Sequence, residues 1–294
     1  MAQDRPLSIS PKGETLMEAK PSYPRLRVVP LRQLRLHEGC DPGRVTTLRE
    51  KLGASGVLRN PVVATEHDGC YIVLDGATRT QALMELGIPN TVVQLVAYER
   101  PAVRLERWHH ALTGLEPASL LEGLREVPGS LFHPCQPDDL ESFLETGGAA
   151  LGIWTHKAGT HRLENVREPE ERVRLINHVV GLYRDRAEVH RTVERDVHTL
   201  RFQYPDLSAV LFFPFFQPAD VLRIALNNAK LPMGITRHVI VDRVLGLNVP
   251  LALLAHSSSQ EEMDLSLKNM MEKRIRDHAV RHYEEPTWVF DDGL

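Results

Sequence analysis

One local pattern constrains the fold of this chain more than any other, an apolar run that ends in a glycine and continues as a helix. The run Val73-Leu74-Asp75 reaches Gly76, and Ala77-Thr78-Arg79 then opens a helical stretch. Free backbone N–H groups at a helix start, with the positive end of its dipole, favour an anion. The guanidinium of Arg79 can add a charge-assisted contact. The pattern therefore predicts a strand–turn–helix unit with a phosphate cradle at residues 76–79.

The same residues have a plainer interpretation, in which the turn binds no ligand. Asp75 and Thr78 are both residue types that cap helices, so they could serve only to start this one. In the functional interpretation, Asp75 stands at a strand end and could hold a metal ion or a substrate hydroxyl. The neighbouring sequence has to decide between the two.

Periodicity and turn residues around this unit predict a compact α/β domain over residues 23–100. The expected strands are 25–29, 61–65, 70–74 and 91–97, and the expected helices are 42–54 and 77–87. Residues 1–22 lack periodicity and are expected to form a loose N-terminal arm.

A second mixed α/β region is predicted over residues 101–294. Its expected strands are 103–112 and 206–214. A hairpin is expected from 152–156 and 161–163, with its turn at 157–160. The expected helices are 117–126, 168–187, 219–228 and 259–277, with a further helix that opens at 134–137. We expect this region to carry the substrate and dimerisation surfaces.

Composition restricts the class of protein without naming it. Hydrophobic residues make up 42% and charged residues 25% of the chain, which are ordinary globular values. A formal net charge of -4 gives no broad basic footprint for DNA. The three cysteines form neither a paired framework nor a Cys-x-x-Cys metal clip, so we expect reduced thiols, a cytoplasmic location and no membrane association.

The order of these parts resembles the ParB/sulfiredoxin-like fold over residues 24–98, whose nucleotide phosphates lie on a Gly-x-x-Arg turn, here Gly76 to Arg79 followed by Ala82. Sulfiredoxins need a cysteine at the turn, where this chain has Ala77 and Thr78. Partition proteins carry a helix-turn-helix domain behind the turn, and no basic tri-helical segment follows here. The third branch of the fold is the free L-serine kinase family, which includes kinases of siderophore gene clusters.

The second half of the chain is also similar to that kinase family. Leu36-His37-Glu38, followed by Asp41-Pro42 and Arg44-Val45, resembles a His-Glu loop whose glutamate is the catalytic base. Trp108 falls where the family has a substrate-contacting tryptophan. The run from Leu231 through Thr236, Arg237 and His238 to Arg243 and Leu251 is similar to the family's C-terminal signature.

The resemblance implies a kinase that phosphorylates free L-serine to O-phospho-L-serine, a precursor in amino-acid or siderophore biosynthesis. The implied cofactors are ATP or ADP and Mg²⁺, with the terminal phosphates on Gly76, Ala77, Thr78 and Arg79. Glu38 and Asp75 are the implied catalytic residues, and Asp75 would also orient the metal. The serine would be held by Trp108, Thr236, Arg237, His238 and Arg243, and a homodimer is expected.

Two departures from the family pattern keep an alternative open. Thr78 stands where many members have a histidine, and Val241-Asp242 replaces the usual Pro-Gly before the signature arginine. The alternative is a nucleotide-binding, ParB-like transcriptional regulator without transfer activity. The adjacent pair His109-His110 suggests a metal site only weakly, because neighbouring strand residues face opposite sides, and we expect solvated histidines there.

Overall fold

The structure is a computed structural model of the 294-residue chain, and it describes residues 23–127, 131–164, 169–255, 258–283 and 287–290. The expected arm of residues 1–22 lies outside the described residues. No helix in the described part of the chain is long and apolar enough to cross a membrane.

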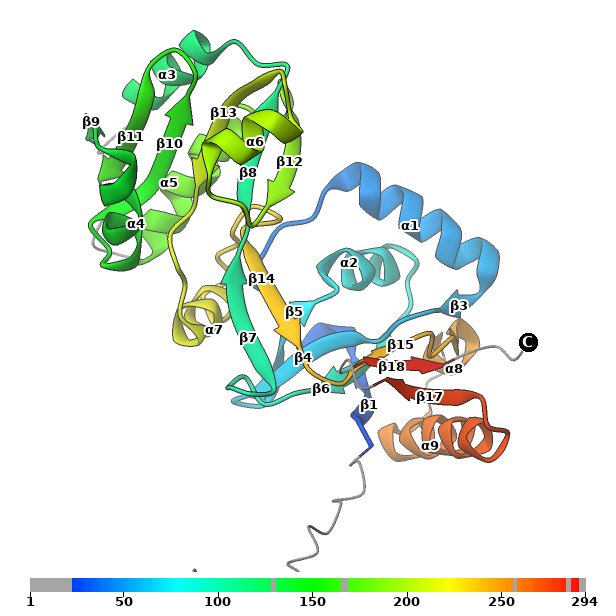
Figure 1. Cartoon of the computed structure of the whole chain (residues 1–294). Helices are drawn as coiled ribbons and strands as arrows, with labels where there is room; N and C mark the ends of the chain where they lie inside the picture. The colour runs from blue at the N-terminus through cyan, green and yellow to red at the C-terminus, as the bar shows by residue number, and fades with distance from the viewer. Residues whose placement is uncertain (1–22, 128–130, 165–168, 256–257, 284–286, 291–294) are drawn as a thin grey trace, which may run out of the picture.

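A five-stranded mixed sheet forms the first part of the molecule, with helices on both sides (Figure 1). Its strands, in spatial order, are β1 (Arg25–Pro30), β6 (Asn90–Leu95), β4 (Val62–His67), β5 (Cys70–Asp75) and β2 (Leu34–Leu36). The pair β4–β5 is an antiparallel hairpin, whereas β4–β6 and β2–β5 are parallel. The 3-10 turn η1 (Leu31–Gln33) joins β1 to β2, and the helices α1 (Pro42–Ser55) and α2 (Ala77–Glu85) lie on one side. The strands and helices predicted for this part are confirmed, with ends that shift by a few residues.

Local sequence signals set the bounds of α1. The side chain of Asp41 accepts a hydrogen bond from the backbone N–H of Arg44 at 2.8 Å, and Pro42 occupies the first helical turn, where no N–H is required. At the other end Gly56 adopts a left-handed conformation, with φ of 66°. Such a residue ends a helix and is most often glycine because it has no Cβ.

The C-terminal part of the chain returns to the first sheet. Helices α8 (Leu251–Ala255) and α9 (Gln260–Arg276) pack against β6 and β1, and Leu247, Leu254, Met263 and Leu267 join the core of that sheet. A small sheet of β15 (Arg243–Leu245), β18 (Thr287–Phe290) and β17 (Val280–Tyr283) lies beside it, and β16 (Val249–Pro250) pairs with β3 (Val57–Leu58). The predicted region 101–294 therefore does not pack as one unit, because its last part shares the first core.

A six-stranded antiparallel sheet forms the second part. Its strands, in spatial order, are β12 (Glu188–Thr192), β8 (His109–Thr113), β13 (Leu207–Phe212), β10 (Ala149–Thr155), β11 (Gly159–Glu164) and β9 (Phe132–Pro134). Its helices are α3 (Pro117–Arg125), α4 (Pro137–Glu145), α5 (Pro169–Gly181), α6 (Val197–Gln203) and α7 (Pro218–Leu226). The predicted hairpin, the buried strand and most helices are present; the helix expected over 168–187 ends at Gly181, and residue 168 lies outside the described residues.

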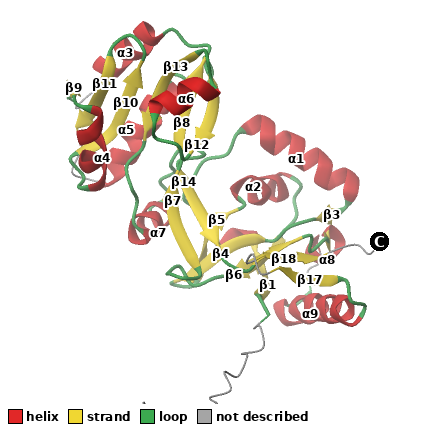
Figure 2. Ribbon diagram, viewed as in Figure 1, coloured by secondary structure: helices red, strands yellow, loops and turns green. Residues whose placement is uncertain are grey.

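A two-stranded ribbon of β7 (Val103–Arg107) and β14 (Thr236–Ile240) lies between the two sheets (Figure 2). The single strand predicted over 103–112 is therefore wrong. It breaks at Trp108, whose backbone N–H donates to the carbonyl of Ile235 at 2.8 Å, and β8 then enters the second sheet. Thr236, Arg237 and His238 lie on β14, directly after a turn in which Gly234 has φ of 79°.

Candidate active site

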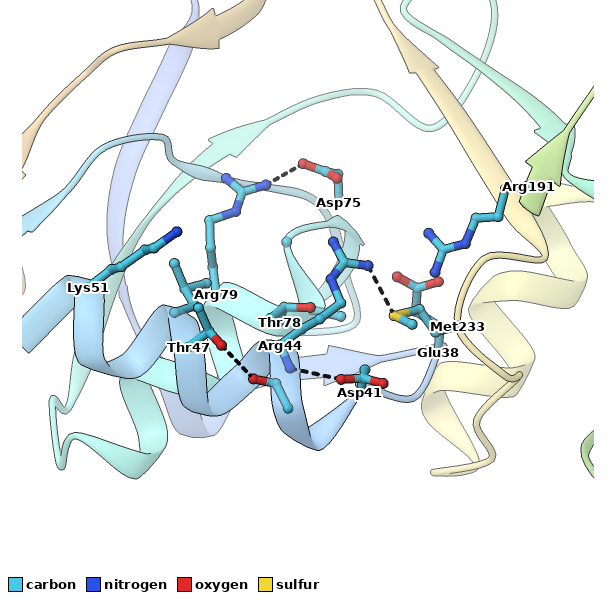
Figure 3. Close-up of a pocket in the computed structure, with 14 residues that line it drawn as sticks. Glu38, Asp41, Arg44, Thr47, Lys51, Asp75, Thr78, Arg79, Arg191 and Met233 are labelled. Carbon is cyan, nitrogen blue, oxygen red and sulfur yellow. Dashed lines mark hydrogen bonds and ion pairs between the residues drawn. The ribbon is translucent and has the colours of Figure 1, made fainter. Parts of the chain in front are cut away.

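A cleft of about 670 Å³ opens where α2 begins (Figure 3). One wall is the side of α1 that carries Arg44, Thr47 and Lys51, and the floor is formed by residues 75–79. The remaining wall comes from Glu38 and from two residues far along the chain, Arg191 and Met233. The cleft thus combines a helix N-terminus with several cations, which is the composition of an anion site.

The start of α2 has the geometry of a phosphate cradle. Gly76 is its N-cap residue, with φ of 112°, and no side chain caps the helix, so the interpretation of Asp75 and Thr78 as mere caps is wrong. The first N–H groups of the helix are therefore not satisfied by a capping side chain. A Cβ at position 76 would lie 3.2 Å from the Arg79 guanidinium and from Val62 Cγ2, so close packing as well as backbone angle favours glycine.

Glu38 lies in the loop after β2, and backbone hydrogen bonds hold this loop against Leu231. Gly39 donates to the Leu231 carbonyl at 2.8 Å, and Leu231 donates to the His37 carbonyl at 2.9 Å. Burial raises the pKa of Glu38 to about 7, although a backbone hydrogen bond from Gly234 and the charge of Arg191 act in the other direction. A carboxyl with a pKa near neutrality is suited to accept a proton at physiological pH.

Asp75 is the last residue of β5, and its carboxylate pairs with two arginines. Arg79 and Arg243 both donate to Oδ2 of its carboxylate. Arg79 also donates to the carbonyls of Asn60 (3.1 Å) and Pro61, so its guanidinium is held from behind the cleft. Oδ1 of Asp75 has no hydrogen-bond partner among the described residues.

A second cavity of about 390 Å³ adjoins the first on the side of the β7–β14 ribbon. Glu38, Asp75 and Arg191 line both cavities. The other walls of the second cavity include Trp108, Thr236, Arg237, His238 and Arg243. The structure therefore brings together all the residues predicted for substrate binding. The two predicted catalytic carboxylates lie on the wall between the first and the second cavity.

A buried histidine network supports this wall. The Nδ1 of His37 lies 2.8 Å from the Val73 carbonyl and must carry a proton, so Nε2 accepts from the Thr236 hydroxyl at 2.8 Å. Burial lowers the pKa of His37 to about 4, which keeps the ring neutral. His238 contacts the same ring edge-on, and its Nε2 accepts from the Tyr98 hydroxyl at 2.7 Å. Thr236 and His238 thus line the second cavity with side chains that already have protein partners.

Trp108 and Arg237 contact each other in the lining of the second cavity. The guanidinium of Arg237 lies over the Trp108 ring, 5.0 Å from its centroid, and also pairs with Glu106. A cation above an aromatic face is attracted by the ring quadrupole. The arrangement places a planar cation over a large ring in the lining of this cavity.

No protein-family model matches the chain. An ATP-dependent L-serine kinase of Staphylococcus aureus, SbnI, is 25% identical over 248 residues, which are 82% of this chain and 88% of that protein. An ATP-dependent L-serine kinase of Staphylothermus marinus is 32% identical over 120 residues, 40% of this chain and 47% of that protein.

Solved structures show the same fold. C-terminally truncated SbnI from Staphylococcus aureus superposes with a TM-score of 0.66 at 21% identity and covers 85% of this chain and 97% of that structure. A free serine kinase in complex with AMP superposes with a TM-score of 0.67 at 16% identity, over 78% of this chain and 93% of that one. The chain is thus similar to ATP-dependent L-serine kinases over most of its length and shares the ParB/sulfiredoxin-like fold. Because the match to SbnI spans most of both chains, it includes residues of both sheets.

Several residues of this site were not predicted. Arg44, Thr47 and Lys51 lie three and four positions apart on α1, so they share the helix face that lines the first cavity. That spacing was readable in the sequence, although a polar stripe on a helix more often faces solvent. Arg191 and Met233 had no such signal, because only the packing of β12 and of the loop before β14 brings them to the cleft.

The prediction of solvated histidines at 109 and 110 is wrong. Both side chains are buried, with 2% and 3% of their surface exposed. His110 Nε2 donates to the Gly234 carbonyl at 2.9 Å and its Nδ1 accepts from the Tyr183 hydroxyl at 2.7 Å, while His109 Nδ1 accepts from the Phe213 N–H at 3.3 Å. Protein hydrogen bonds replace the water that we expected. No group of three or more metal-binding side chains is present among the described residues.

Mg²⁺ is the metal that the serine kinase family implies, and the donors fit it only in part. Glu38 and Asp75 supply two carboxylates to the first cavity, and Oδ1 of Asp75 is not occupied by a described side chain. Mg²⁺ commonly binds one or two carboxylates and takes its other ligands from substrate phosphates and water. The site therefore suits an ion that arrives with a nucleotide rather than one held by the protein alone.

Proposed function

We propose that this chain is a kinase that transfers the terminal phosphoryl group of a nucleotide to the hydroxyl of free L-serine and forms O-phospho-L-serine. One observation carries the proposal. Glu38 and Asp75 stand on the wall shared by a phosphate-type cavity and a smaller cavity lined with arginines. A donor and an acceptor can thus meet at the two carboxylates. The names of the relatives, ATP-dependent L-serine kinases, support the same reaction.

The donor binds in the first cavity. Its terminal phosphates lie on the N–H groups of residues 76–79, with Arg44, Lys51 and Arg79 among the cations that line the cavity and the Thr78 hydroxyl as a further donor. Phosphoryl transfer depends mainly on positioning and charge stabilisation, and such a cradle supplies both. Asp75 would hold Mg²⁺, which would supply further charge neutralisation when bound.

The acceptor binds in the second cavity. Arg243 and Arg237 hold the carboxylate of the amino acid, because a planar guanidinium pairs with a carboxylate through two parallel hydrogen bonds. His238 and Thr236 shape the cavity from β14, and Trp108 closes its outer side. The serine hydroxyl then points to the shared wall, where Glu38 accepts its proton.

The alternative of a ParB-like regulator without transfer activity receives less support. Such a protein needs a nucleotide site and a DNA surface, but no acceptor cavity beside a carboxylate. The most basic helix, α9, carries Lys268, Lys273, Arg274 and Arg276 interleaved with Glu272, which is not a continuous basic face. A cytoplasmic location and a homodimer stay predictions.

The direct test is a turnover assay with the purified chain, Mg²⁺, L-serine and either ATP or ADP. Mass spectrometry of the products should show O-phospho-L-serine with at least one nucleotide, and parallel reactions with L-threonine and L-homoserine report selectivity. Bound nucleotide without any phosphoserine would instead favour the regulator.

A further inference from the structure

Arg191 has a position that the roles proposed so far do not explain. It lies on β12 of the second sheet, yet its side chain reaches the junction of the two cavities and lines both. Besides Arg191, only Glu38 and Asp75 do so among the residues that line these cavities. Figure 3 shows its guanidinium directed toward the Glu38 carboxylate.

The guanidinium of Arg191 makes no contact of its own that stabilises the described part of the fold. It makes no hydrogen bond or ion pair with any residue in the described part of the chain, in contrast to Arg79, Arg237 and Arg243, which pair with carboxylates. Its side chain is exposed to the cleft. An arginine directed into a site with its donors unused has them available for a ligand.

The absence of a side chain at Gly234 leaves room for the side chain of Arg191. Gly234 has φ of 79°, and a Cβ there would overlap the Arg191 guanidinium and lie 2.8 Å from its Cδ. The loop at Gly234 is fixed from the second sheet, because its carbonyl accepts from the buried His110, which in turn is held by Tyr183. Arg191 therefore lies over a turn that is held in place by hydrogen bonds. The backbone of Gly234 in this turn also hydrogen-bonds to Glu38.

We infer that Arg191 is a catalytic residue that binds the phosphoryl group while it moves from donor to acceptor. The inference rests on the proposed kinase activity. In that reaction the serine Oγ forms a bond to the terminal phosphorus and the bond to the bridging oxygen breaks. The nucleotide leaves with the electron pair, and Glu38 takes the hydroxyl proton. Negative charge is spread over the three equatorial oxygens of the transferring group, and a guanidinium at the shared wall stabilises it.

The test compares Arg191→Met, which keeps a long side chain over Gly234 but removes the charge, with Arg191→Lys. Arg184→Met is the matched control, since Arg184 is an exposed cation on the same side that lines neither cavity. Arg191→Met should lower kcat about 10²- to 10³-fold, the usual effect of removing one donor to a transition-state charge. Arg191→Lys should lose less, because a point charge remains without the fork.

Affinity for AMP, measured by calorimetry, separates catalysis from damage to the nucleotide site, because AMP lacks the group that is transferred. Arg191→Met should bind AMP within about threefold of the native protein and melt at the same temperature, since only interactions specific to the transition state are lost. A native kcat in Arg191→Met, or a loss confined to the KM for L-serine or to AMP affinity, overturns the inference and leaves the kinase proposal intact. No phosphoserine from the native protein overturns both.

Discussion

Arg243 and Arg79 both donate a hydrogen bond to the same carboxylate oxygen of Asp75. Arg243 is 168 positions from Asp75 in the sequence. Arg79 approaches Asp75 from the first cavity and Arg243 from the second. The ion pair thus fixes the C-terminal signature segment against the strand end that opens the phosphate cradle. Arg79 and Arg243 can be substituted separately. We expect the first substitution to change nucleotide binding and the second to change serine binding.

Arg243→Lys should raise the KM for L-serine at least about tenfold, because a lysine cannot pair with a carboxylate in the bidentate geometry of a guanidinium. The nucleotide affinity should stay unchanged, since Arg243 does not line the first cavity. His238→Ala should give a smaller effect of the same kind, because its ring already has Tyr98 as a partner. Steady-state kinetics with calorimetry of AMP checks both, and an equal loss of nucleotide affinity would assign this segment to the phosphate site.

Arg79→Ala should weaken nucleotide binding by about 1.5 to 3 kcal/mol, the usual contribution of a charge-assisted hydrogen bond. It should also lower the melting temperature, because the guanidinium holds the carbonyls of Asn60 and Pro61 as well as Asp75. Calorimetry and thermal unfolding measure the two effects. Unchanged affinity in a variant that remains folded would place the phosphates elsewhere.

The rate should depend on pH through Glu38. A general base must be ionised, and burial raises the pKa of this carboxyl to about 7. The value of kcat/KM should therefore be constant well above pH 7 and fall about tenfold per pH unit below it. A profile from about pH 5.5 to about pH 8.5 measures this. A rate that stays constant down to about pH 5 would mean that an ordinary carboxylate, or no carboxylate, accepts the proton.

Stability should decrease as the solution is acidified. Burial lowers the pKa of His37 and His110 to about 4 and that of His109 to about 3, so the unfolded chain binds more protons than the folded chain below the ordinary value of 6.5. By linkage, the free energy of unfolding is highest above 6.5 and falls as the pH drops toward 4. His37 alone would account for roughly 3 kcal/mol at pH 4.

Glu38 acts in the opposite direction, because its raised pKa makes the folded state bind the extra proton between 4.5 and about 7. Three histidines should outweigh one glutamate, so the net slope remains positive with pH. Urea unfolding at about pH 7.5, pH 6 and pH 5 measures the sign. Equal or greater stability at pH 5 would show that these rings are not held neutral.

Local signals were sufficient to predict the first part of the fold. Gly76 between an apolar run and a helical run predicted the strand–turn–helix unit, and Asp41-Pro42 marked the start of α1. These elements depend on neighbours within a few residues, and the sequence carries that information directly. The similarity to the kinase signature likewise predicted that Glu38, Asp75 and Arg243 would lie together.

Features that depend on distant partners were not predicted. The break at Trp108 arises because its N–H bonds to Ile235, and the burial of His110 depends on Tyr183 and Gly234. Arg191 reaches the site only because the second sheet places β12 beside the Glu38 loop. Each of these contacts joins segments more than 70 positions apart, and neither periodicity nor turn residues report on such pairing.

Glu38→Gln tests the central claim most directly, because the amide keeps the shape of the side chain and removes its basicity. The variant should bind AMP as the native protein does and form phosphoserine about 10² to 10⁴ times more slowly. Glu50→Gln, on the exposed side of α1, is the matched control and should turn over at the native rate. A native rate of phosphoserine formation by Glu38→Gln would contradict the account, because the carboxylate between the two cavities would then not be the base.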